Sequence, residues 1–177
     1  MSPALRQILA VLACTFGLIC LTGQLNHALA PFGLTLEVAG LLCAFAGLRL
    51  EFSRAFTVAL LTGFLVDAGT PVGFGRHAFL FGLMVCLLSR VRFRLPREET
   101  LVGVVTALFI NLACFVVTGF VALGSLPDTT SGALRLLADL LVSQLFIALI
   151  GPWFFALQLR ALAFAGASPA TAIRRYA

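Results

Sequence analysis

Six long apolar stretches make up most of this 177-residue chain, and their length limits the folds that are open to it. They cover about residues 8–25, 31–48, 55–68, 75–89, 101–123 and 134–157. A helix needs about 20 mostly apolar residues to cross a bilayer. A chain that is 61% hydrophobic and only 11% charged has too few charged side chains to cover a soluble surface. We therefore predict an all-α integral membrane protein, a bundle of six transmembrane helices.

The same pattern leaves no room for a separate soluble domain. We expect the six-helix transmembrane domain to occupy residues 1–160 and a short cytoplasmic tail to occupy residues 161–177. The third and fourth stretches are short, so we expect them to form a tight helical hairpin around a hinge. The hinge residues are glycines and a proline: Gly69, Pro71, Gly73 and Gly75.

All twelve basic residues are arginines, and their distribution predicts the orientation of the helices. With the N-terminus in the cytoplasm, ten arginines fall in cytoplasmic segments, and only Arg76 and Arg135 fall outside. Cytoplasmic loops of membrane proteins carry such an excess, so we expect both termini in the cytoplasm. In the alternative, Arg6, the first apolar run and "ALA" at 28–30 act as a cleaved signal peptide. Cleavage would leave five spans, although Pro31 directly after the cut disfavours it.

Charged side chains gather in the predicted outer half of the bundle. A charge at mid-bilayer costs about 2.5–3.5 kcal/mol on insertion scales, so opposite charges are expected to meet. Asp67 and Arg76 flank the hinge and are expected to pair across it, while Arg135 and Asp139 are four residues apart on one helix face. These groups either fix helix packing only, or line a pocket or dock a partner. The candidate residues are Glu37, Asp67, Arg76, His77, Arg135 and Asp139.

Uncharged polar and small residues inside the apolar stretches predict helix contacts. We expect Asn111 and Gln144 each to form a hydrogen bond to a neighbouring helix. Gly151–Pro152 is expected to bend or break the last helix. The five cysteines lie singly, without metal or redox spacing, and are expected to pack. Stripes of small residues predict close helix approach: Ala39, Cys43 and Gly47; Ala59 and Gly63; Ala78 and Gly82.

The segment "RVRFRLPREE" at 90–99 alternates arginines with apolar residues. Such an amphipathic strip can lie at the headgroups with its arginines on anionic lipid, or it can bind an acidic cytoplasmic partner. Topology alone also accounts for these arginines. The candidate residues of this loop are Arg90, Arg92, Arg94 and Arg97.

Catalytic patterns are absent from the sequence. It contains no G-x-S-x-G, no H-E-x-x-H and no glycine-rich phosphate loop. The positive charge first reflects topology rather than binding to nucleic acid. We therefore expect a non-enzymatic protein without a cofactor or a metal site.

The stretch "TGFLVDAGTPVGFGRHAFLFGL" at 62–83 resembles the signature of the MreD family, rod shape-determining membrane proteins of bacteria. In that family a spanning helix ends in G-x-x-x-D, matched here by Gly63 and Asp67. A short loop, a glycine and a basic or histidine residue follow, matched by 69–75, by Gly73 or Gly75, and by Arg76 and His77. The length and the six short spans also agree. The second span departs from the family, because Pro31 is followed by "FGLTLE" instead of Asp or Asn.

This resemblance implies a non-enzymatic scaffold subunit of the rod, or elongation, complex in the inner membrane. Such a subunit would bind MreC and, through it, MreB, RodA and the class B penicillin-binding transpeptidase, and so support peptidoglycan synthesis and cell shape. The resemblance also implies a fold similar to the S components of energy-coupling-factor transporters. The alternative is therefore a true S component that captures a vitamin-sized solute. A small channel or permease is a third possibility, but no relay of charges crosses the full bilayer depth.

Overall fold

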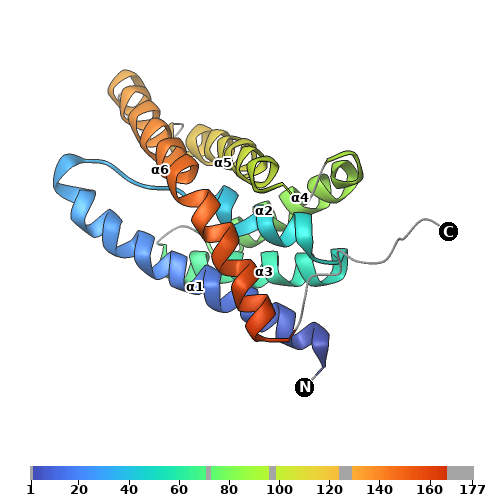
Figure 1. Cartoon of the computed structure of the whole chain (residues 1–177). Helices are drawn as coiled ribbons and strands as arrows, with labels where there is room; N and C mark the ends of the chain where they lie inside the picture. Colours follow the sequence, from blue (N-terminus) through green and yellow to red (C-terminus); the bar gives the residue numbers. More distant parts are fainter. Residues whose placement is uncertain (1, 71–72, 96–98, 124–128, 167–177) are drawn as a thin grey trace.

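The computed structural model describes residues 2–70, 73–95, 99–123 and 129–166, and these residues form an all-helical structure (Figure 1). The prediction of an all-α fold is thus confirmed for this part of the chain. The helices are α1 (Pro3–Leu29), η1 (Ala30–Phe32), α2 (Ala39–Arg49), α3 (Phe52–Gly69), α4 (Arg76–Val91), η2 (Arg92–Arg94), α5 (Thr100–Leu123) and α6 (Thr129–Phe164). Two of the predicted site residues, Pro71 and Arg97, lie outside the described residues.

Four helices, α1, α3, α5 and α6, are long and apolar enough to cross a membrane. This supports the predicted transmembrane character of the chain. The other two α-helices are shorter, with 11 residues in α2 and 16 in α4. At 1.5 Å per residue they rise about 16 and 24 Å, less than the roughly 30 Å of a bilayer's hydrocarbon core. The prediction of six full spans is therefore not confirmed.

The second predicted span, 31–48, differs most from the structure. η1 ends at Gly33, whose φ of 67° is in the left-handed region, and residues 34–38 form no helix. Only at Ala39 does α2 begin, and its residues from Ala39 to Leu48 are all buried. A short helix that is apolar on every side belongs at the centre of a bundle. The apolar stretch thus provides an inner helix and an irregular lead-in segment instead of one lipid-facing span.

The helices alternate in direction, so the bundle has two ends. At one end α1 begins and α6 finishes, as the lower part of Figure 1 shows, and the Arg6 guanidinium donates to the backbone carbonyl just after α6 at 3.2 Å. Arg54, near the start of α3, donates to Gln7 of α1 at 2.7 Å. Arg92, after α4, donates to the carbonyl that follows α2 at 2.7 Å. We call this end the arginine end, and the opposite end, where α3 finishes and α4 begins, the Asp67 end.

The described arginines divide unequally between these two ends. Arg76 begins α4 and Arg135 lies in the first two turns of α6, so both lie toward the Asp67 end. The others lie at helix termini of the arginine end: Arg6, Arg49, Arg54, Arg90, Arg92, Arg94 and Arg160. This is the division from which the orientation was predicted. That the arginine end faces the cytoplasm stays a prediction.

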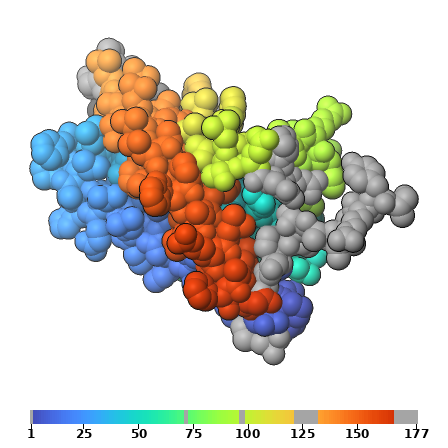
Figure 2. All heavy atoms as spheres, viewed as in Figure 1, coloured from blue at the N-terminus to red at the C-terminus, as the bar shows by residue number. Residues whose placement is uncertain are grey.

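The exposed surface is apolar and much of the polar material is buried, the reverse of a soluble domain. Figure 2 shows α6 lying along the surface of the molecule, and exposed large apolar side chains recur every four residues along this helix. They are Leu137, Leu141, Leu145, Leu149 and Trp153. Buried polar side chains include Asn111 and Gln158, both 0% exposed. Lipid can cover such a surface, while buried polar groups hold membrane helices together.

Glycines allow the closest helix contacts. A Cβ added to Gly63 of α3 would lie 2.3 Å from the Ala78 Cα of α4, as the predicted small-residue stripes require. At Gly40 of α2 it would lie 1.8 Å from the Ala107 oxygen of α5, a contact that the sequence analysis missed. α6 stays one helix through Pro152, so the predicted break does not occur.

Candidate functional site

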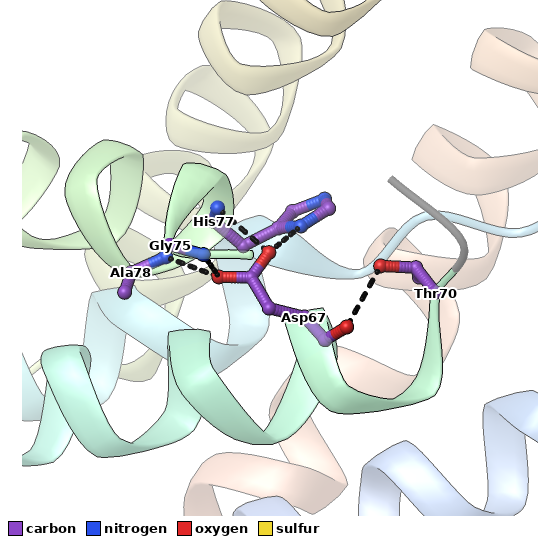
Figure 3. Close-up of polar contacts among 5 residues, drawn as sticks. All are labelled: Asp67, Thr70, Gly75, His77 and Ala78. Carbon is purple, nitrogen blue, oxygen red and sulfur yellow. Dashed lines mark hydrogen bonds and ion pairs between the residues drawn. The ribbon is translucent and has the colours of Figure 1, made fainter. Parts of the chain in front are cut away.

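Asp67 joins α3 to α4 through its carboxylate, which is the centre of the predicted site (Figure 3). Oδ2 accepts hydrogen bonds from the backbone N–H groups of Gly75 and Ala78 at 3.0 and 3.2 Å, and Oδ1 accepts one from that of His77 at 3.0 Å. The amides at the start of a helix have no partner within it. A side chain at the end of α3 therefore caps the beginning of α4, and Asp67 itself is only 3% exposed.

The His77 ring strengthens this cap. Its Nδ1 lies 2.7 Å from Asp67 Oδ1. An ionised carboxylate only accepts hydrogen bonds, so Nδ1 carries the proton and, in the neutral ring, Nε2 is left as an acceptor. The hinge needs glycine at Gly75, whose φ of 95° is in the left-handed region. On the α3 side, the Thr70 hydroxyl donates to the Asp67 backbone oxygen at 3.4 Å and closes the helix end.

The predicted ion pair between Asp67 and Arg76 is wrong. Arg76 instead donates from Nη2 to the backbone oxygen of Thr118, on α5, at 3.2 Å. Amides of the first turn of α4 and the His77 ring occupy the Asp67 carboxylate, while residue 76 lies on the side of α4 that meets α5. Asp67 thus fixes α4 to α3, and Arg76 fixes α4 to α5.

The predicted pair between Arg135 and Asp139 is also replaced by another contact. Asp139, 3% exposed, accepts the Thr35 N–H on Oδ1 and the Thr35 hydroxyl on Oδ2, both at 2.8 Å. Arg135 is exposed one turn earlier on α6. The irregular segment before α2 needs partners for its backbone, and a carboxylate that can accept two hydrogen bonds from it supplies them.

Two further side chains, missed from the sequence, hold the same segment. Asn26 of α1 makes two hydrogen bonds with Leu36, accepting from its N–H at 2.7 Å and donating to its carbonyl at 3.1 Å. The Ser143 hydroxyl of α6 accepts from the Glu37 N–H at 2.9 Å. Ser143 lies one helical turn after Asp139 on α6, and this spacing is the sequence signal that could have indicated its role. Side chains of α1 and α6 thus supply the partners that a continuous helix would have provided.

The two predicted amide contacts between helices are present. Asn111 of α5 accepts the Gly40 N–H at 3.3 Å, at the start of α2. Gln144 of α6 donates to the carbonyl of Leu108, on α5, at 3.2 Å. Each amide therefore joins its helix to a neighbour, as expected for polar side chains in a membrane bundle.

A cavity of about 460 Å³ lies among these elements, between α1, the segment before α2, and helices α2, α3, α4 and α5. Two residues of the predicted charge cluster, Glu37 and His77, line it, and so does the hinge residue Gly69. The other four have a structural place instead: Asp67 and Asp139 are buried against backbone amides, Arg76 binds α5, and Arg135 is exposed. The predicted charge cluster is therefore a framework of helix contacts beside a cavity that two of its members line.

The arginine loop is divided between protein and surface. Arg92 is half-buried, donates to the Leu50 carbonyl and lies 5.3 Å over the Phe93 ring. Arg90 and Arg94 are exposed, as contact with lipid or a partner requires. Three of the four predicted loop arginines are thus placed, and one of them has a structural role.

The fold and the site define a class: an all-helical protein of transmembrane character. Polar side chains of its long helices hold the irregular segment that leads into the short inner helix α2. Within the described ranges, no three His, Cys, Asp or Glu side chains are grouped so that they could hold a metal ion. Comparison with known protein families, curated proteins and solved structures finds no match for this chain.

Proposed function

We propose that this chain is a membrane scaffold subunit of the bacterial rod complex, without catalytic activity, which binds MreC in the inner membrane. The observation that carries the proposal is the stretch from Gly63 to His77, where the residues that resemble the MreD signature act as one unit. Gly63 lets α4 approach α3, and Asp67 caps α4 and binds the His77 ring. A scaffold needs such a fixed hairpin, because a partner can recognise only a surface whose helices keep their positions.

Exposed charge at the two ends suggests where partners bind. Arg135 is the exposed basic residue that α6 presents at the Asp67 end, the end we assign to the periplasm. The periplasmic part of MreC would meet this end. Arg90 and Arg94, exposed at the arginine end, would face anionic lipid or MreB.

The cavity favours a second candidate function. An S component of a vitamin transporter captures its solute in a pocket with apolar walls and a few polar groups. The 460 Å³ cavity has such a lining. The scaffold remains our first proposal, because the Gly63–His77 stretch resembles the MreD signature.

Affinity purification in mild detergent distinguishes the two functions. We expect the tagged chain to recover MreC and the cell-wall synthase subunits; recovery of an ATPase module instead would establish the transporter and refute the scaffold. Arg135→Ala should reduce MreC recovery without changing the melting temperature of the chain. Arg160→Ala, which removes an exposed arginine at the opposite end, is the matched control and should leave recovery unchanged.

A further inference from the structure

The cavity beside Asp67 has an unusual balance of hydrogen-bonding groups. Four threonines line it, and all four hydroxyl protons are already donated to the protein. Thr22 donates to the Leu18 carbonyl at 2.9 Å and Thr118 to the Cys114 carbonyl at 3.0 Å. Because a hydroxyl has one proton and two lone pairs, each of these oxygens can only accept a further hydrogen bond.

The other two threonines follow the same rule, and Asn26 and His77 add further polar groups to the lining. The hydroxyl of Thr35 donates to Asp139 and that of Thr70 to the Asp67 carbonyl. The Asn26 side-chain amide is an exception, because it donates one N–H to the Leu36 carbonyl and has a second N–H. The His77 Nδ1 lies 2.7 Å from Asp67 Oδ1, so this nitrogen is already engaged by the protein.

Glu37 adds a carboxyl group to this lining. It is half-buried, lines the cavity, and its backbone N–H is held by Ser143, which fixes its position at the cavity wall. Within the described residues Glu37 makes no ion pair, and no arginine lines the cavity. A carboxyl group beside hydroxyls that can only accept suits a ligand that is both a hydrogen-bond donor and a cation.

The rest of the lining favours an organic ligand. No described group of three His, Cys, Asp or Glu side chains is placed to coordinate a metal. Apolar side chains such as Leu42, Leu65, Leu80 and Phe81 make up most of the wall. We infer that this cavity binds a small organic cation, a protonated amine whose N–H groups meet Glu37 and the lone pairs of the wall, and whose apolar part packs on Phe81. The inference holds whether or not the chain is a scaffold.

Equilibrium dialysis of the purified full chain in lipid nanodiscs tests this, with empty nanodiscs subtracted. The probes are phenethylamine and two analogues of the same shape, phenethyl alcohol and phenylpropionate. We expect saturable binding of the amine only. Glu37→Gln should weaken it about tenfold or more, because a hydrogen bond to a charged group is lost. Glu51→Gln, which removes an exposed carboxylate at the arginine end, should leave it unchanged.

A second variant tests the location independently of the charge. Gly23 of α1 lines the cavity, and a Cβ added there meets nothing within 4 Å, so Gly23→Phe should fill the space without a backbone clash and abolish amine binding. Wild-type affinity in Gly23→Phe would overturn the site. Equal binding of alcohol and amine, or wild-type affinity in Glu37→Gln, would overturn the assigned ligand class. The assay contains no partner protein, so it can fail or succeed separately from the MreC experiment.

Discussion

Replacing Asp67 by alanine tests the reasoning about the candidate site most directly. The substitution removes the acceptor of three backbone N–H groups at the start of α4 and the partner of the His77 ring. Each buried donor left without a partner costs about 1–3 kcal/mol, and water can satisfy part of this loss. We expect Asp67→Ala to cost about 3–5 kcal/mol of the free energy of unfolding.

A series of variants separates the terms. Asp67→Asn keeps one oxygen but turns an NH₂ group toward backbone N–H groups, so its cost should lie between wild type and Asp67→Ala. His77→Ala removes only the ring contact and should cost about 1 kcal/mol. Glu51→Gln removes one member of an exposed ion pair with Arg54, so it should change the free energy of unfolding by less than about 0.5 kcal/mol.

The assay is the fraction of purified protein that stays monodisperse by size-exclusion chromatography after heating in mild detergent. One kcal/mol shifts the melting temperature by about 2–4 °C in a domain of this size. Asp67→Ala should therefore melt about 6–20 °C below wild type. A melting temperature within about 2 °C of the Glu51→Gln control would refute the role of Asp67 as the cap of α4.

Three further predictions concern packing, the segment before α2, and orientation. Gly40→Ala should prevent recovery of monodisperse protein, since its Cβ would lie 1.8 Å from a backbone oxygen of α5. The control is Gly17→Ala, whose Cβ would meet nothing within 4 Å, and it should leave the melting temperature unchanged or slightly raised. Asp139→Leu should lower the melting temperature by several degrees because it removes two hydrogen bonds to Thr35, whereas Arg135→Ala should not. A cysteine replacing Arg94 in a cysteine-free chain should react with an impermeant maleimide only from the cytoplasmic side.

The controls for these predictions are internal. A cysteine replacing Phe74, which is 73% exposed at the Asp67 end, should react only from the periplasmic side. Labelling on the reversed sides would overturn the orientation. Equal melting temperatures for Asp139→Leu and Arg135→Ala would show that the segment before α2 does not depend on the carboxylate. Normal monodisperse protein from Gly40→Ala would contradict the close packing of α2 on α5.

The sequence predicted the lipid-facing helices better than the inner one. The stretch 101–123 matches α5 (Thr100–Leu123) to within one residue, because length and hydropathy alone decide whether a helix can span. The stretch 31–48 failed, because its hydropathy is the same whether the backbone is helical or extended. Its conformation depends on side chains of other helices, such as Asn26 and Asp139, that form hydrogen bonds to it. Which helices lie beside this segment is decided by the tertiary fold and cannot be read from the local sequence.

The site was predicted in part for the same reason. Asp67 was expected to be paired at the end of its helix, and it is, but with His77 and backbone amides instead of Arg76. Backbone N–H groups are identical at every residue, so no pattern of side chains shows which of them a carboxylate will find. The sequence analysis predicted a pocket only as one possible use of the charge cluster, since the walls of the cavity come from six parts of the chain that meet only after folding.

The irregular segment before α2 has a consequence for how the chain is made. Two of its partners, Asp139 and Ser143, are 104 and 106 residues further along than the amides they bind. Until the ribosome has delivered α6, those amides lack acceptors, and lipid cannot supply them. We therefore expect the first half of the protein to stay bound to the insertion machinery, or this segment to form a temporary helix, until α6 has been made. We expect chains truncated after residue 123 to be degraded rapidly in pulse-chase experiments, while the full-length protein persists.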